Sequence, residues 1–399
     1  MATGPTMIDT QSNHLDWLDD LDGQDAKAWV EMQNKRTEEQ LKDDEYEKDV
    51  HDLRTALGHV DKAPEVTRID EFIYNFWTDA QHPQGIWRRT PYAKFKLGEE
   101  CWDVLLDLDE PCGREEKKYF WDGVDILPTD RSRAIIHLSD GGSDAVRLRE
   151  WSLVSRTFVE DGFNLDMAIS SVTWLDEDTL LLASSHGDPK NSTVSGRPRT
   201  IRLWRRGQPV KDTKVLFSTT YESDHVSTER DWAFAQIRLY LTETIDGDRR
   251  RHYIAHDDFD FNLISLPWDV RCKFGGDWAA AYLKEDWNTA TRTFSMDTLL
   301  VAGVDALGGC MRPEVLWEGT EGSALRDFQF INNCICINLV EHLRPVLKLF
   351  VHGTDGWQRR RCFHQATQSL LSRGGPHGRH HGRKSPLAEE DLVEHFRFV

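Results

Sequence analysis

Short apolar runs separated by polar turn residues fill the chain from about Thr67 to Trp357. Runs such as residues 135–138, 179–182 and 200–204 are rich in β-branched, leucine and aromatic residues, and turn signals such as Asp140-Gly141-Gly142-Ser143 lie between them. Runs of this length bounded by Gly, Asp and Asn predict antiparallel β-strands. No long helical periodicity interrupts them, so we do not expect a parallel βαβ sheet.

The predicted strands recur in groups of four. Residues 123–161 form one such unit and residues 171–218 a second, and further units begin near His225, Gly275 and Ala324. A four-strand unit that repeats every 45 to 55 residues or so is typical of a β-propeller blade. We therefore predict a mainly β fold, a propeller of six to seven blades that could be incomplete, with a large β-sandwich as the alternative.

The pattern changes at both ends of this region. Residues 14–60 are acidic and nearly free of glycine and proline, which predicts an N-terminal helical segment. Asp22 or Asp25 is the expected cap of a first helix, and Asp44 with Glu47 reads as a capping box for a second.

These boundaries divide the chain into four parts. We predict a disordered start over residues 1–13, the helical segment over 14–60, the propeller over 67–358 and a divergent tail over 359–399. Residues 359–386 hold seven Arg or Lys and no acidic residue, so the tail is expected to be basic and largely disordered.

The net charge of the chain argues against two classes of binding partner. The chain has 68 acidic and 49 basic residues and a net charge of −19. A general nucleic-acid binder needs a basic footprint, and so does broad adhesion to an anionic membrane, so neither partner is expected. The seven cysteines are scattered and odd in number, and the first 13 residues have no signal-like apolar stretch, which predicts a cytoplasmic protein.

The sequence offers no convincing catalytic motif. An α/β-type serine hydrolase needs G-x-S-x-G, and the nearest stretch, Gly141-Gly142-Ser143-Asp144-Ala145, lacks the last glycine and lies between two predicted strands. We interpret it as a hairpin turn. A P-loop and a strand-bound G-x-G-x-x-G are also absent, so we predict no catalytic residue and no cofactor.

Metal ligands are also weakly supported. His377, His380 and His381 lie together in the basic tail, where nothing preorganises them, so no metal site is predicted. Cys334 and Cys336 lie two apart in a strand-like run, which places both on one face, and we interpret them as buried thiols rather than a redox pair.

One dense polar cluster has two interpretations. It could be a functional site, or it could be a strand–turn–strand with charged edges, and we favour the second. Its members are Trp77, Asp79, His82, Trp87, Arg88 and Arg89.

The same cluster carries a family resemblance. Residues 74–90, YNFWTDAQHPQGIWRRT, closely resemble the opening of the propeller in prolyl oligopeptidase family serine peptidases, nearest to a bacterial and fungal branch. Further matches follow in order at residues 102–109, 121–125, 138–146, 158–163 and 355–357, and residues 17–20 and 28–34 resemble the family's N-terminal helical segment. The resemblance covers about residues 14–358.

The resemblance implies a seven-bladed propeller that covers a C-terminal α/β-hydrolase domain. It implies a central cavity that admits short peptides, so a peptide substrate and the hydrolase domain are the implied partners. The family's Ser, Asp and His come from the hydrolase domain, and none of them can be placed on this chain. The N-terminal helices of the family normally pack against that same domain.

The chain departs from the family pattern in two ways. The resemblance stops at Trp357, and about six blade-sized units fit in residues 69–358. We expect a truncated family member that supplies the gating, substrate-selecting propeller of a serine-type peptidase and does not hydrolyse peptides alone, because triad catalysis needs nucleophile and base together. The alternative is a non-catalytic propeller that binds a protein or peptide.

Overall fold

A computed structural model describes residues 15–20, 23–58, 66–99, 101–141, 143–232, 237–306, 313–331 and 334–360. The chain divides into two compact units, residues 1–63 and residues 64–399. The predicted start over 1–13 lies outside the described residues, and so does most of the predicted tail. Arg359 and Arg360, which we assigned to the tail, are the last two residues of a strand.

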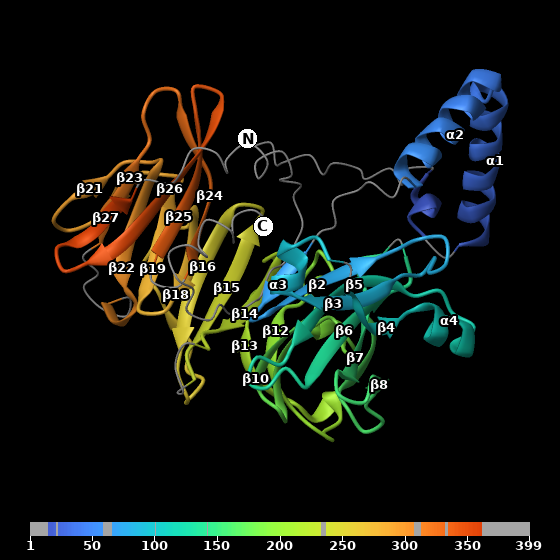
Figure 1. Ribbon diagram of the computed structural model, residues 1–399, viewed down its shortest axis with the longest axis horizontal. Coiled ribbons are helices and arrows are strands. Elements are labelled where there is room, and N and C mark those ends of the chain that lie inside the picture. The colour runs from blue at the N-terminus through green and yellow to red at the C-terminus, as the bar shows by residue number, and fades with distance from the viewer. Residues whose placement is uncertain are drawn as a thin grey trace, which may run out of the picture. The chain divides into compact units, whose positions relative to one another are not determined.

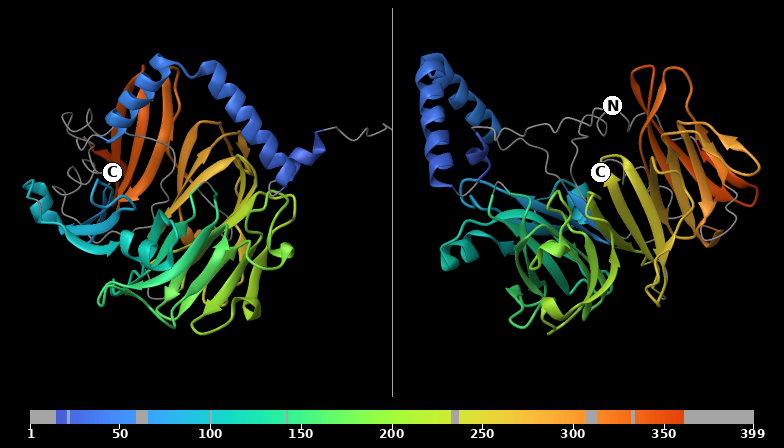
Figure 2. Two further views of the ribbon diagram at one scale, coloured as in Figure 1. Left: turned by 90° about the vertical axis from the view of Figure 1, so that its right-hand side faces the viewer. Right: turned by 180° about the vertical axis from the view of Figure 1, so that it is seen from behind.

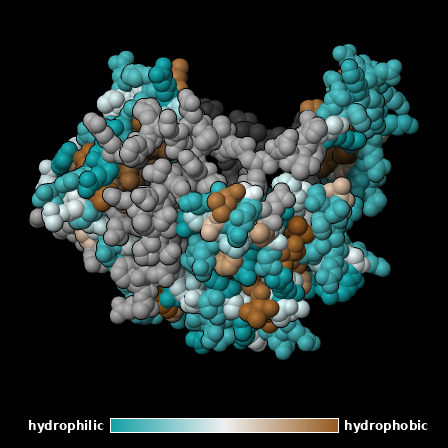
Figure 3. Space-filling model, in the orientation of Figure 1, coloured by the Kyte–Doolittle hydropathy of each residue, from teal (hydrophilic) through white to brown (hydrophobic). Residues whose placement is uncertain are grey.

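The first unit contains the predicted helices. A short 3₁₀ turn, η1 (Asp16–Asp19), precedes α1 (Gln24–Leu41) and α2 (Asp44–Gly58). The side of these helices that Figure 3 shows is mostly hydrophilic, as expected for their many Glu, Asp and Lys residues. Most large apolar side chains of this unit that the structure describes are exposed to solvent: Leu15, Trp17, Trp29, Val30, Met32, Leu41, Tyr46 and Leu53.

The predicted helix caps were wrong by one or two residues. Gly23 is the N-cap of α1 and makes no side-chain cap, while Asp25 lies in the first turn, where a negative charge favours the helix dipole. At α2 the backbone N–H of Tyr46 donates to Asp43 Oδ1 at 2.8 Å, so Asp43 rather than Asp44 caps the helix.

The second unit consists of consecutive four-stranded antiparallel sheets, coloured from blue to orange along the chain (Figure 1). In the first sheet two short helices follow the third and fourth strands. Its elements are β1 (Thr67–Ile69), β2 (Phe72–Trp77), β3 (Ile86–Pro91), α3 (Tyr92–Lys96), β4 (Asp103–Asp107) and α4 (Asp109–Glu115).

The second and third sheets follow the predicted units closely. The second comprises β5 (Phe120–Ile126), β6 (Arg133–Ser139), β7 (Val146–Ser152) and β8 (Thr157–Phe158), with β9 (Asn164–Ala168) also paired to β7. The third comprises β10 (Ser170–Asp176), β11 (Thr179–Ser184), η2 (Pro189–Asn191), β12 (Thr200–Arg205), η3 (Val210–Asp212) and β13 (Lys214–Ser218).

The fourth and fifth sheets repeat the pattern, and the fifth carries an inserted hairpin. The fourth comprises β14 (His225–Arg230), β15 (Leu239–Asp246), β16 (Arg249–Ala255) and β17 (Asn262–Leu263). The fifth comprises β18 (Val270–Gly275), β19 (Trp278–Leu283), β22 (Thr298–Gly303), η4 (Val304–Ala306) and β23 (Glu314–Glu318), and its hairpin is β20 (Trp287–Asn288) with β21 (Thr293–Phe294).

The sixth sheet comprises β24 (Ser323–Ile331), β25 (Cys334–Glu341), β26 (Arg344–Gly353) and β27 (Gly356–Arg360). Four of the five predicted unit starts agree with the strands within about three residues, but the fifth sheet begins at Val270 and not near Gly275. Gly275 is instead the end of β18. Arg271 and Lys273 alternate with apolar residues there, so the strand does not stand out as an apolar run.

Each sheet is a propeller blade, because apolar faces of successive sheets pack against one another. Tyr74 and Trp87 of the first sheet share a core with Ile136 and Leu138 of the second. Equivalent clusters join the second to the third, the third to the fourth, the fourth to the fifth and the fifth to the sixth sheet. The predicted mainly β propeller preceded by helices is thus confirmed. Within the described residues no strand pairing joins the first blade to the sixth, so the ring of sheets is not closed.

Candidate functional site: the inner strands of the propeller

First strands of several neighbouring blades lie side by side, since β10 contacts both β5 and β14, and β18 contacts β24. Figure 2 shows the successive sheets from two further sides. We call the half-buried and exposed side chains of these first strands the inner wall.

Hydroxyl groups form the inner wall between the third and fourth blades. Thr173 on β10 donates from Oγ1 to the carbonyl oxygen of Thr228 on β14 at 2.8 Å, and the two hydroxyl oxygens are 3.0 Å apart. Both side chains are half-buried. This contact ties two inner strands together and leaves hydrogen-bonding groups near the surface.

Charged groups form the inner wall between the fifth and sixth blades. Arg271 on β18 donates from Nη1 to the carbonyl oxygen of Arg326 on β24 at 2.8 Å. Lys273 Nζ lies 2.9 Å from Asp327 Oδ1, and both side chains are about half exposed. An exposed pair like this contributes little to stability, so its groups remain available to a charged or polar ligand.

The inner wall therefore offers hydrogen-bond donors, acceptors and both signs of charge on rigid strands. Such a surface can contact the backbone and polar side chains of a peptide. The inner-wall residues named above do not pair a nucleophile with a base. Their groups can bind a ligand but do not form a catalytic site.

A buried carboxylate fixes the second blade against the third. The Glu150 side chain is fully buried and receives two bonds from Arg206, Nη1 to Oε2 at 2.7 Å and Nη2 to Oε1 at 3.0 Å. The backbone N–H of Phe163 donates to the same carboxylate at 2.9 Å, and Arg133 approaches it at 3.3 Å. A bidentate pair with additional donors is the arrangement in which a buried charge is tolerated.

Buried polar groups also occur in the fourth blade. Tyr253 donates its hydroxyl to Glu243 Oε2 at 2.7 Å, and burial together with this bond raises the pKa of Tyr253 to about 12. Thr219, from the segment before this blade, also donates to Glu243. Burial lowers the pKa of His252 to about 4, with a smaller contribution from the charge of Arg250, so His252 is neutral near pH 7.

The polar cluster predicted around the tryptophans forms the hairpin between β2 and β3. Asp79 organises the turn: its Oδ1 accepts from the backbone N–H of Gln81 at 2.8 Å and of His82 at 2.9 Å, and its Oδ2 accepts from Trp77 Nε1 at 3.2 Å. The backbone bond from His82 is the largest of the effects that hold the pKa of Asp79 below its usual value.

The remaining members of the cluster stabilise the sheet. Arg88 donates to Asn75 Oδ1 at 2.9 Å and lies over the ring of Trp77. Arg89 pairs with Asp103 at 3.4 Å, while Trp87 is buried and stacks on Tyr74. The structure thus places these residues in a strand–turn–strand with charged edges, the interpretation we favoured.

The other sequence candidates occupy ordinary structural positions. Gly141 and Ser143 lie in the turn between β6 and β7, where the backbone N–H of Ala145 donates to Ser143 Oγ at 3.0 Å. Cys334 and Cys336 are buried on β25. His377, His380 and His381 lie outside the described residues.

One arrangement resembles a catalytic triad in its distances. Asp224 Oδ2 lies 3.1 Å from His225 Nδ1, and His225 Nε2 lies 3.5 Å from Thr244 Oγ1. Thr244 is only 4% exposed, in the interior of a strand that pairs with β14. A peptide carbonyl cannot reach this hydroxyl, so the group does not form an acyl-transfer site.

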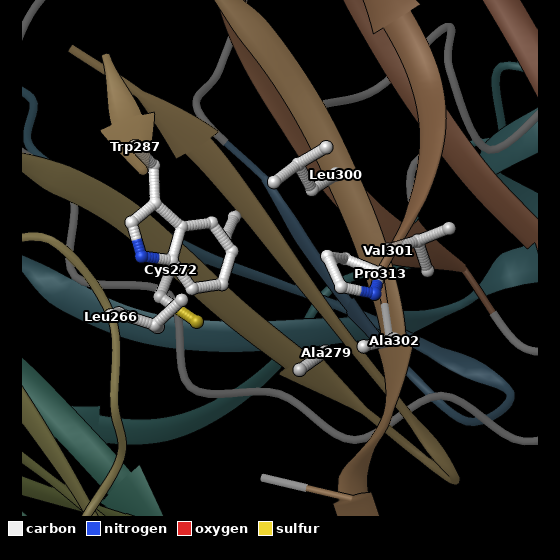
Figure 4. Close-up of a pocket in the computed structure, with 9 residues that line it drawn as sticks. Leu266, Cys272, Ala279, Trp287, Leu300, Val301, Ala302 and Pro313 are labelled. Atoms are coloured by element: carbon white, nitrogen blue, oxygen red, sulfur yellow. The ribbon is translucent and has the colours of Figure 1, made fainter. Parts of the chain in front are cut away.

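A small pocket lies inside the fifth blade under the inserted hairpin. Figure 4 shows Trp287 of the hairpin facing Leu266, Cys272 and Leu300 across it. The space open to the centre of a water molecule is about 10 Å³, enough for about one water, and the lining is apolar. This volume is too small for a substrate or cofactor.

Two other features are absent from the described part of the chain. No group of three or more His, Cys, Asp or Glu residues there is arranged to hold a metal ion. No described helix is long and apolar enough to span a membrane.

Sequence reasoning did not identify the inner wall. The available signal was the alternation of polar with apolar residues in the first strand of each unit, as in Val270-Arg271-Cys272-Lys273. The structure shows that polar positions in successive first strands meet, as Thr173 and Thr228 do.

Comparison with known proteins agrees with this architecture. A model of the prolyl oligopeptidase N-terminal beta-propeller domain matches residues 8–262. An uncharacterized peptidase of Sinorhizobium fredii is 28% identical over 387 residues, which cover 90% of this chain and 52% of the relative. An uncharacterized peptidase of Rickettsia prowazekii is 25% identical over 300 residues, 71% of this chain and 41% of the relative.

Solved structures show the same fold. A post-proline cleaving enzyme from Rickettsia typhi superposes with a TM-score of 0.77 at 22% identity, covering 84% of this chain and 51% of that one. Oligopeptidase B from Trypanosoma brucei has a TM-score of 0.62 at 13% identity, covering 88% and 49%. The chain spans about half the length of these proteins. With the family model matching more than half of its residues, the chain belongs to the prolyl oligopeptidase N-terminal β-propeller family.

Proposed function

We propose that this chain is the substrate-selecting propeller of a serine-type peptidase and that it works together with an α/β-hydrolase domain that carries the catalytic residues. The observation that carries the proposal is the inner wall, since Thr173, Thr228, Arg271 and Lys273 place groups able to bind a peptide on the first strands of their blades. The family membership supports the pairing with a hydrolase domain. The chain is expected to act in the cytoplasm, which fits the free thiols of Cys101, Cys112 and Cys272.

The exposed apolar side chains of the helical unit support the need for a partner. Trp29, Met32 and Leu53 are 36%, 56% and 62% exposed. Large apolar groups gathered on one small unit favour an interaction surface. A hydrolase domain is the partner that the family implies for it.

The proposal is tested by joining this chain to the C-terminal half of the Sinorhizobium fredii relative. The chimera should cleave a short Gly-Pro amide substrate and leave an unfolded protein such as casein intact. Cleavage of casein as efficiently as of the short substrate would contradict the selecting role.

A charge-reversal variant addresses the inner wall itself. Lys273→Glu places two carboxylates beside each other on the inner wall, so the chimera should show a KM for an acidic peptide raised by about three- to tenfold, with KM for the uncharged amide unchanged. Lys214→Glu, on the exposed outer strand β13, is the matched control and should change neither value. Equal effects of the two variants would argue for a non-specific charge effect.

The alternative, a propeller that binds a peptide or protein without a catalytic partner, predicts a different outcome. It requires the isolated chain to bind a ligand tightly, whereas the proposed function requires the hydrolase domain to complete the site.

A further inference from the structure

Three cationic side chains lie together where β18 contacts β24. Arg271 and Lys273 are two residues apart on β18, so they point to the same side of the strand, and Arg326 lies on β24. Lys273 Nζ lies 2.9 Å from Asp327 Oδ1, which balances its charge. No described carboxylate forms an ion pair with Arg271 or with Arg326. We call Arg271, Lys273 and Arg326 the cationic cluster.

The guanidinium group of Arg271 is held by the backbone of β24 and keeps donors to spare. Its Nη1 donates to the carbonyl oxygen of Arg326 at 2.8 Å, and its Nη2 donates to that of Leu325 at 3.4 Å. Each Nη atom carries two hydrogens, so one N–H on each remains without an acceptor in the described part of the chain. A carboxylate can accept hydrogen bonds from two such groups at once. The backbone contacts thus fix Arg271 in place without using up its capacity to bind an anion.

A β-bulge brings Arg326 to the surface beside Arg271. Leu325 and Asp327 pair with consecutive residues of β25, which makes Arg326 an extra residue in β24. The extra residue breaks the alternation of buried and exposed positions, and both Arg326 and Asp327 are exposed. Bulges of this kind re-aim side chains and are frequent next to functional sites. The bulge therefore adds a second guanidinium group to the surface that Arg271 and Lys273 form.

The exposed charges of three other first strands have the opposite sign. On β5, β10 and β14 the exposed charged side chains are all carboxylates: Asp122, Asp176 and Glu229. The whole chain has a net charge of −19. Three cations with one carboxylate are thus a local departure from an acidic background. Electrostatic complementarity favours an anionic group at the cationic cluster and disfavours one at those three strands.

We propose that the cationic cluster binds a carboxylate group of a short peptide. Arg271 and Arg326 provide planar guanidinium groups that match the geometry of a carboxylate, and Lys273 adds a point charge. The choice of a peptide as the source of the carboxylate rests on the proposed function. The carboxylate is the C-terminal group of the peptide or an acidic side chain, and the binding measurement below distinguishes the two.

Three tetrapeptides with an N-terminal trifluoroacetyl group test this site in the full chain. They are Gly-Pro-Ala-Ala with a free carboxylate, the same peptide as its amide, and Gly-Pro-Asp-Ala as its amide. Fluorine NMR line broadening at low salt measures their dissociation constants. At least one carboxylate peptide should bind about tenfold tighter than the neutral amide, and the tighter of the two identifies the source of the carboxylate. Equal dissociation constants for all three, or no binding of any, would overturn the proposal.

A matched pair of substitutions assigns this preference to the cluster. Arg326→Gln removes an exposed guanidinium group and should reduce the preference for the carboxylate to about threefold or less. Arg344→Gln removes an exposed guanidinium group from β26 of the same blade and should leave the preference unchanged. Both side chains are exposed, so neither substitution should affect folding. Equal preferences in the two variants would contradict binding by the cluster.

The chimera with the hydrolase half of the relative separates this site from the proposed function. If the chimera cleaves the Gly-Pro amide substrate but the free-acid and amide tetrapeptides inhibit it equally, the proposed function stands and the carboxylate site is wrong. If the full chain prefers the carboxylate peptide but the chimera does not cleave, the carboxylate site stands and the proposed function fails.

Discussion

A tryptophan of the propeller, Trp87, is buried, whereas a tryptophan of the helical unit, Trp29, is exposed to solvent. Trp87 in the first blade is 2% exposed, between Tyr74 and the apolar residues of the second blade. Trp29 in α1 is 36% exposed, and its one described ring contact is an edge-on approach to Trp17 at 6.3 Å between ring centres. The blades make a core with one another, whereas two helices alone are too small to do so. The difference indicates that the helical unit depends on a partner and the propeller core does not.

The sharpest test of this contrast is a matched pair of substitutions. Trp87→Ala removes a large buried ring and should lower the free energy of unfolding of the propeller by about 3–5 kcal/mol. Trp29→Ala should lower it by less than about 0.5 kcal/mol. Urea unfolding followed by circular dichroism measures both. Similar losses for the two variants would mean that the helices are part of the propeller core.

The buried Glu150 carboxylate between the second and third blades should contribute nearly as much to the stability of the propeller as an apolar core residue does. Glu150→Ala leaves the guanidinium groups of Arg206 and Arg133 without their shared carboxylate, and we expect a loss of about 3–5 kcal/mol in the same assay. Glu160→Ala, at an exposed position of the same blade, should cost less than about 0.5 kcal/mol. A small effect of Glu150→Ala would show that water replaces the carboxylate.

Acid should weaken the fourth blade. The pKa of His252 is about 4 in the folded chain against 6.5 ordinarily, so the unfolded chain takes up the proton first as the pH falls. The contribution of His252 to stability is therefore complete above pH 6.5 and declines by up to about 3 kcal/mol towards pH 4.

Unfolding midpoints across this pH range measure the effect. His252→Phe should flatten the dependence, whereas His256→Asn, at an exposed position, should leave it unchanged. A slope that survives in His252→Phe would assign the acid sensitivity to other groups.

The smallest expected effect is at the hairpin between β2 and β3. Gly85 has a φ of 97°, and a Cβ at this position would collide with the ring of Phe76. Gly85→Ala should therefore cost about 1–3 kcal/mol. Gly98 also has a positive φ, of 70°, but open space around it, so Gly98→Ala should cost about 1 kcal/mol. Equal losses at the two positions would mean that Phe76 moves aside freely.

The sequence predicted the blades well because each strand leaves a local signal. The runs that contain Ile135 and Leu181 are apolar because they lie in central strands that are buried on both sides. The start of the fifth blade was predicted near Gly275 instead of Val270, because Arg271 and Lys273 interrupt the apolar pattern of β18. The cap of α2 shifted by one residue, since adjacent acidic residues can each serve as the cap, and Gly23 takes that position at α1.

The candidate site could not be predicted from the sequence in the same way. The inner wall depends on contacts between strands of different blades, such as Thr173 with Thr228, and a polar residue in a strand gives no sign of whether it meets solvent or another strand. Asp224, His225 and Thr244 show the opposite case. Their residue types and distances would suit catalysis, but Thr244 is buried, so no substrate can reach its hydroxyl.

The central proposal is that this chain supplies the propeller of a peptidase whose catalytic residues lie on an α/β-hydrolase domain. The most direct measurement incubates the purified chain with a Gly-Pro amide substrate and with a serine-directed phosphonate. We predict no hydrolysis and no covalent labelling. Hydrolysis that the phosphonate abolishes, with one label per chain, would contradict the claim.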